Sequence, residues 1–259
     1  MKNILNMKQS DYLKPLIIGL SIIITAFVLG SAFKNRNAKT DTISVIGLGT
    51  KDFESDEIYW SGNFETKAID AKEAFNIITA DKAKVKAFFL AKGFKENEIN
   101  FGGVNFEKSY RTITSEGNDA NSRRTEQVFD GYTAKQSVSF TSKKNVELMK
   151  KIENVIDQSA EMINSGIQFN PDRVQYTFSD LPSLKHSLIE KATQDAKERA
   201  KKIVKTGDGS MGKLKDASMG VFQITGVGAI EEDSYGGNND TYSKQKTAKI
   251  TVRLSYVLD

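Results

Sequence analysis

The residues whose types and spacing come closest to a known chemistry are residues 207–214, GDGSMGKL. They nearly fit the pattern G-x-x-x-x-G-K-[ST], in which backbone N–H groups and a lysine hold phosphates. A phosphate loop needs a strand before it, a helix after it and a hydroxyl beside the lysine. Here a helix is expected before the loop and a strand after it, and Leu214 stands where the hydroxyl is needed. The sequence therefore predicts the end of a helix and a turn instead of a phosphate site.

Histidine, cysteine and carboxylate chemistry is equally sparse. The chain has no cysteine, which excludes disulfides, iron–sulfur clusters, cysteine-bound zinc and a thiol nucleophile. His186 is the single histidine, and we expect it on the surface near a helix end. Oxygen ligands gather in residues 229–246, but their spacing does not follow the twelve-residue calcium loop. The sequence predicts no catalytic residue, no metal site and no cofactor.

The charge of the chain is concentrated near the N-terminus. The 37 basic and 33 acidic side chains give a net charge of +4, and residues 1–40 hold six of the basic side chains against one acidic side chain. The rest of the chain is therefore close to neutral. Because binding to a phosphate backbone needs a concentrated basic surface, we expect no nucleic-acid partner.

An uncharged run of eighteen residues, 16–33, predicts a membrane-spanning helix. At 1.5 Å per residue it spans roughly 27 Å, enough for the hydrocarbon core of a bilayer. The expected anchor residues are Leu16, Ile17, Ile18, Ile22, Ile23, Ile24, Phe27, Val28, Leu29 and Phe33. The alternative is a cleavable signal peptide, because Gly30, Ser31 and Ala32 resemble a small-residue cleavage site. Both interpretations export the remainder of the chain.

Periodicity predicts an α+β fold, a mixed, largely antiparallel sheet packed with about three helices and preceded by one transmembrane helix. The expected domains are a short basic segment at 1–15, the anchor at 16–33, a linker at 34–41 and a folded domain at 42–259. Gly47 and Gly49 indicate a turn after the first strand, and Ser142 is expected to cap the second helix of the domain. The expected strands are 42–48, 58–66, 104–114, 131–141, 167–178, 221–227 and 248–257, and the expected helices are 70–93, 142–166 and 180–205. Residues 115–127 are expected to form a polar loop or the tip of a hairpin, and residues 230–246 a polar loop.

The third helix of the domain carries an apolar stripe at Leu188, Ala192, Ala196 and Ala200. Alanines on one face of a helix allow another backbone to approach closely. Two explanations stay open. The stripe packs on the sheet of its own chain, or it meets a second copy.

The body resembles the SIMPL-domain family (DUF541), a family of unknown function, over about residues 41–259. The matching segments are ISVIGLG at 43–49, FDGYTAKQSVSF at 129–140, GIQF at 166–169, ATQDAKERAKKIVKTGDGSMGKL at 192–214 and KITVRLSYVL at 249–258. The usual Pro-Asp after the first strand is replaced here by residues 53–56, FESD. The resemblance implies an exported, non-enzymatic α+β domain that forms ring- or channel-like homo-oligomers, is linked to envelope stress, and has no established catalytic residues.

Together these features predict a single-pass protein of the cell membrane whose soluble domain lies in the periplasm or elsewhere outside the cytoplasm. We expect it to self-associate into a ring or scaffold of the cell envelope. If the leader is cleaved, the domain is secreted instead. The alternative function is an envelope receptor that binds a small molecule, of unknown identity, or an ion through residues 229–246 and the aromatic early strand at Tyr59, Trp60 and Phe64.

Overall fold

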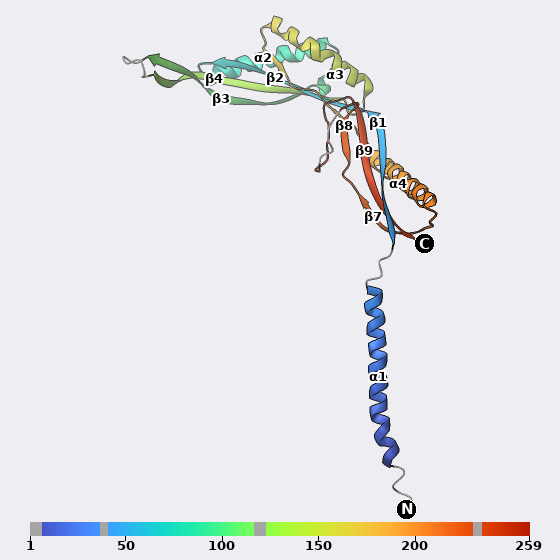
Figure 1. Ribbon diagram of the computed structural model, residues 1–259. Coiled ribbons are helices and arrows are strands. Elements are labelled where there is room, and N and C mark those ends of the chain that lie inside the picture. The colour runs from blue at the N-terminus through green and yellow to red at the C-terminus, as the bar shows by residue number, and fades with distance from the viewer. Residues whose placement is uncertain (1–6, 37–40, 117–122, 230–234) are drawn as a thin grey trace, which may run out of the picture. The chain divides into compact units, whose positions relative to one another are not determined.

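The computed structural model describes residues 7–36, 41–116, 123–229 and 235–259 (Figure 1). In chain order the elements are α1 (Met7–Arg36), β1 (Thr42–Glu54), β2 (Glu57–Ala68), α2 (Ala71–Ala91), η1 (Glu96–Glu98), β3 (Asn100–Glu116), β4 (Arg123–Thr141), α3 (Val146–Gln158), η2 (Ser159–Ser165), β5 (Phe169–Pro171), β6 (Gln175–Thr177), α4 (Leu181–Thr206), β7 (Met211–Met219), β8 (Gln223–Gly226) and β9 (Gln245–Leu258). The expected α+β class is confirmed.

The chain divides into two compact units, which are described separately. The first unit contains Met1–Val45, Lys197–Ala217 and Leu254–Asp259, and the second contains Ile46–Ala196 and Ser218–Arg253. The strands form two sheets. One has the order β1-β9-β7 with β8 also paired to β9, and the other has the order β3-β4-β2-β5 with β6 also paired to β2.

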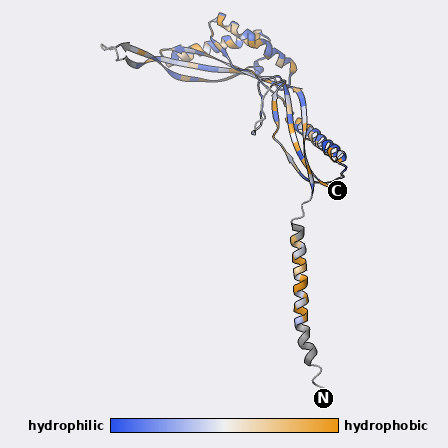
Figure 2. Cartoon of the chain, in the orientation of Figure 1, coloured by the Kyte–Doolittle hydropathy of each residue, from blue (hydrophilic) through white to orange (hydrophobic). Residues whose placement is uncertain are grey.

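Helix α1 contains the expected apolar run. The stretch Pro15–Phe33 has a mean hydropathy of 2.5, and none of it is buried. Figure 2 shows the middle of this helix as mostly hydrophobic. Backbone hydrogen bonds are satisfied inside a helix, so such a run is compatible with a membrane environment or with a signal sequence.

The second unit has an aromatic core between the β3-β4-β2 sheet and helices α2 and α3. Trp60 on β2 stacks on Phe140 of β4 with ring centroids 5.5 Å apart, and Phe89 of α2 lies 4.6 Å from Phe140. Trp60 and Phe64 are fully buried, so both are core residues. Tyr59, the third aromatic of this strand, faces outward and is exposed.

Local signals place the helix ends of this unit. Asp70, the first residue of the helix expected over 70–93, caps α2 by accepting hydrogen bonds from the N–H groups of Lys72 and Glu73. Gly166 ends η2 in the left-handed conformation with φ of 76°. The predicted cap of α3 is wrong. Asn145, not Ser142, accepts from the Leu148 N–H.

Ser142 has a different role in the structure. Its buried hydroxyl accepts a 3.0 Å hydrogen bond from the backbone N–H of Ile58, which lies on another strand. The two residues after Ser142, Lys143 and Lys144, have positive φ angles of 45° and 65°, which are not helical, so α3 begins only at Val146.

Two other expectations are corrected, and one of two alternatives is decided. β1 does not turn at Gly47 and Gly49 but continues to Glu54. The single strand expected over 167–178 is two short strands, β5 and β6, because the two pair with β2 in registers that differ by one residue, Gly62 opposite Pro171 and Tyr59 opposite Gln175. Of the two alternatives for residues 115–127, the structure agrees with the hairpin: β3 continues to Glu116 and β4 begins at Arg123, and residues 117–122 lie outside the described residues.

Candidate functional site

The stripe of α4 is buried within the chain itself. Leu188 is 1% exposed, and Ala192, Ala196 and Ala200 are 0% exposed. Part of this burial comes from β1, whose Gly47 approaches so closely that an added Cβ would lie 2.1 Å from the Ala192 carbonyl oxygen. Glycine in the interior of a strand often marks such a close approach of two backbones. Buried side chains offer no surface to a second copy.

The free edge of β1 is occupied by side chains from the same helix. The Asp195 carboxylate accepts a 2.8 Å hydrogen bond from the Leu48 N–H, and the Lys191 ammonium donates a 3.0 Å hydrogen bond to the Thr50 carbonyl. Unpaired edge groups are templates for the addition of another strand. Here two of them are already paired, which closes this part of the edge.

A long two-stranded ribbon extends from the second unit (Figure 1). β2 pairs with β4 only as far as Ala68 opposite Tyr132, whereas β3 and β4 continue to pair up to Glu116 opposite Arg123. The distal ribbon, defined as residues 109–116 and 123–131, therefore has no third strand among the described residues. An isolated two-stranded hairpin is marginally stable in water.

The distal ribbon carries exposed apolar side chains. Tyr110 of β3 and Phe129 of β4 are cross-strand partners with ring centroids 5.9 Å apart, and both are exposed. Phe129 also contacts Tyr132, and Ile113 is exposed further along β3. Sequence analysis predicted a strand at 104–114 but did not single out these residues. The signal was present in the aromatic side chains at 110 and 129 on either side of a polar tip.

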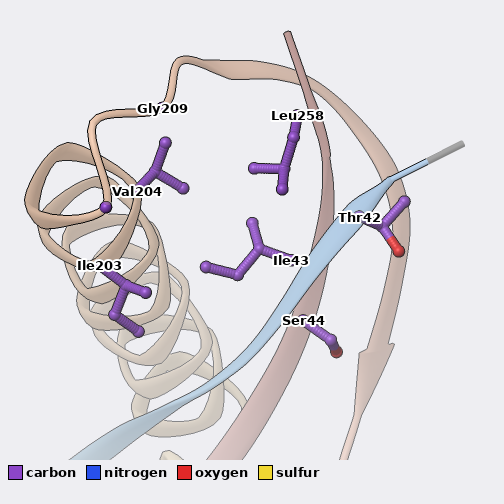
Figure 3. Close-up of a pocket in the computed structure, with 8 residues that line it drawn as sticks. Thr42, Ile43, Ser44, Ile203, Val204, Gly209 and Leu258 are labelled. Carbon is purple, nitrogen blue, oxygen red and sulfur yellow. The ribbon is translucent and has the colours of Figure 1, made fainter.

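A second apolar feature, the α4–β1 groove, lies in the first unit (Figure 3). It has a volume of about 400 Å³ and is lined by Thr42, Ile43, Ser44, Ile203, Val204, Gly207, Gly209 and Leu258. Figure 3 shows Ile43, Val204 and Leu258 pointing toward the space between the end of α4 and the strands, whereas the hydroxyls of Thr42 and Ser44 lie on the far side of β1. The groove is therefore a site for an apolar group.

A polar cluster joins α3 to the segment before β9. Lys244 lies 3.0 Å from the Glu153 carboxylate and 3.5 Å from that of Glu54. The hydrogen bond with Glu153 raises the pKa of Lys244 above its ordinary value. The Tyr176 hydroxyl donates a 3.1 Å hydrogen bond to Glu153, and burial together with that carboxylate raises the pKa of Tyr176 to about 12. These shifts favour the ammonium and the neutral phenol, so the cluster is built as a set of structural contacts.

The last part of the predicted polar loop is attached to the body. The buried Lys246 ammonium donates to the carbonyls of Tyr176 and Asp240, and burial lowers its pKa. Although burial opposes it, hydrogen bonds from Ser243 and Tyr242 lower the pKa of Asp240. The Tyr176 N–H donates to the Thr241 carbonyl at 2.7 Å. The acidic part of the loop, residues 230–234, lies outside the described residues.

The other candidates from the sequence have ordinary surroundings. His186 is exposed on α4. Residues 207–210 join the end of α4 to β7, and residues 211–214 are the first part of that strand, so a helix precedes the turn and a strand follows, as expected. Among the described residues no group of three or more His, Cys, Asp or Glu side chains is placed to hold a metal ion.

Comparison with known proteins gives one family. The family model described as SIMPL, protein of unknown function (DUF541), matches residues 43–256. No curated protein matches the chain. The match covers both units of the folded domain and leaves α1 outside it.

Proposed function

Because the chain belongs to the SIMPL (DUF541) family, whose function is unknown, we propose that it is a membrane-anchored, exported, non-enzymatic protein that self-associates in the cell envelope. The assembly is a ring or scaffold with a structural and not a catalytic role, and we propose that it functions during envelope stress. The observation that carries this proposal is the exposed apolar ribbon, for which a single copy of the chain supplies no covering surface among its described residues.

The anchor rests on the length and exposure of the apolar run in α1. Its nineteen residues, Pro15–Phe33, extend roughly 28 Å, which matches a hydrocarbon core of about 30 Å. None of the run is buried against the rest of the chain, so a membrane is the environment that would satisfy it. We propose retention of this helix over cleavage, because the run exceeds the 7–15 residues common in the apolar part of signal peptides.

The distal ribbon is the surface through which copies meet. Exposed apolar patches on proteins mark interaction sites, and aromatic side chains are enriched at protein–protein interfaces. Tyr110 and Phe129 form such a pair on a hairpin that needs support to be stable. A second copy packed on this pair would bury it and would also supply the missing support.

The other sheet is protected from uncontrolled pairing. Asp195 and Lys191 occupy part of the β1 edge, and the edge strand β7 carries Lys213 and Lys215 with exposed side chains. Lysines on an edge strand discourage the addition of further strands. We therefore assign assembly to the ribbon of β3 and β4.

The test is the molar mass of the full chain in detergent, measured by light scattering after size-exclusion chromatography over a range of concentrations. We expect multimers for the native chain, and Phe129→Glu weakens association by about thirtyfold, the effect of losing one interface hot spot of about 2 kcal/mol. Tyr235→Glu is the matched control, because Tyr235 is a fully exposed aromatic residue that is not part of the distal ribbon. Monomers of the native chain at every concentration, or equal effects of the two variants, would refute the proposal.

A further inference from the structure

We propose that the α4–β1 groove binds one acyl chain of a phospholipid from the membrane that α1 spans. This inference rests on the proposed anchoring and adds a ligand class that the anchoring does not require. The groove is lined mainly by apolar side chains. Ile43, Val204 and Leu258 face the cavity, and Ile203, another lining residue, is 55% exposed.

The size and chemistry of the groove suit an alkyl chain. A volume of about 400 Å³ lies within the range of ligand sites in proteins. The hydroxyls of the two polar residues on β1 point away from the cavity, so they do not contribute the orienting polar groups that sites for polar ligands use. An alkyl chain gains by leaving water and needs no hydrogen-bond partner.

The segment between the groove and the anchor is short, and this favours the membrane as the source of that ligand. Thr42 lines the groove and is nine residues after Phe33, the last residue of the apolar run. Residues 34–36 are still helical in α1, so the nine residues reach less than the roughly 30 Å of a fully extended segment, and the groove stays within that distance of the end of the apolar run. A ligand confined to the same membrane is thereby held at a high effective concentration.

The connecting segment strengthens this confinement. Lys34, Arg36 and Lys39 are its charged residues before Asp41, so by sequence it is basic. Basic residues next to a membrane helix are attracted to anionic headgroups. Attraction of this segment to the lipid surface keeps the first residues of β1, and with them the groove, close to the lipids.

The experiment uses the full chain in lipid nanodiscs that contain a small fraction of a phospholipid with a diazirine at the end of one acyl chain. After illumination, mass spectrometry locates the labelled residues. We expect label in α1, which reports membrane insertion, and label in peptides that contain Ile203 or Leu258, which reports occupation of the groove. The two sites are read in the same sample.

Two groove variants and one control test the assignment. Ile203→Glu places a charge at the groove, and Gly207→Leu fills it, since an added Cβ at Gly207 meets no atom closer than 3.6 Å. We expect each variant to lower groove labelling by about tenfold without changing the label in α1. Ile163→Glu is the matched control, because Ile163 is 62% exposed on η2 and its replacement leaves groove labelling unchanged.

The outcomes separate this inference from the proposed function. Label in α1 without label in the groove overturns the acyl-chain site and leaves the anchor intact. No label in α1 overturns both. Two results would overturn the phospholipid as the ligand. One is groove labelling that persists in both groove variants. The other is groove labelling by a diazirine fatty acid in detergent without labelling by the nanodisc phospholipid.

Discussion

Substitution of Gly47 by alanine tests the close approach of α4 to β1. An added Cβ would lie 2.1 Å from the Ala192 carbonyl oxygen and 2.4 Å from the Ala196 nitrogen. Both are backbone atoms of a helix, so neither can turn aside. Relief of the contact requires the helix and strand to separate by about 1 Å, and a gap of that size forfeits up to half of each dispersion contact across it.

The expected cost follows from this separation. Overpacking a well-packed interior costs about 1–3 kcal/mol, and two simultaneous backbone clashes place Gly47→Ala near the upper end. For a domain of this size each kcal/mol lowers the melting temperature by about 2–4 °C, so we expect a decrease of about 6–12 °C. Trp60 is the single tryptophan and is fully buried, so its fluorescence reports thermal unfolding of the full chain in detergent.

Gly103→Ala is the matched control for this measurement. Gly103 lies on β3, and an added Cβ there meets nothing within 4 Å. We expect a change within about 0.5 kcal/mol, as for surface substitutions in general. If the melting temperature of Gly47→Ala equals that of this control, α4 does not need the glycine to approach β1 closely.

Three further predictions concern single side chains. Glu153→Gln should lower the pKa of Tyr176 from about 12. The pKa is measured by tyrosinate absorbance, and Tyr176→Phe identifies the band. Because folding raises this pKa, the neutral phenol stabilises the fold at neutral pH, and this stabilisation is lost as the pH rises above about 10. Asn145→Ala removes the cap of α3 and should cost about 1 kcal/mol in urea unfolding; an unchanged midpoint would contradict the assignment. Asp195→Ala leaves the Leu48 N–H on the β1 edge without this acceptor and should cost about 1 kcal/mol and increase aggregation on heating, followed by turbidity.

Local signals predicted the helices well, including the apolar run of α1. The apolar run, the cap at Asp70 and the glycine at 166 each act within a few residues of the structure that they specify. The same signals failed where a distant segment determines the role of a residue. Gly47 suggested a turn, but it lies inside β1 because a helix more than a hundred residues later packs on it.

Residues of the candidate sites were harder to predict for the same reason. Ser142 precedes a helix and resembles a cap, yet its hydroxyl is used by Ile58 on another strand. The groove combines residues from both ends of the folded domain, Ile43 and Leu258, with the end of α4. No spacing along the chain relates these positions, so only the fold reveals that they share a cavity.

The most direct test of the account is to count the copies of the full chain in each particle after extraction from the membrane together with its surrounding lipid, by single-particle mass measurement. The account predicts that the chain is found in the membrane fraction with residues 1–33 intact, and that each particle holds several copies. A chain that is recovered outside the membrane without these residues, or that is present as one copy per particle, would contradict it.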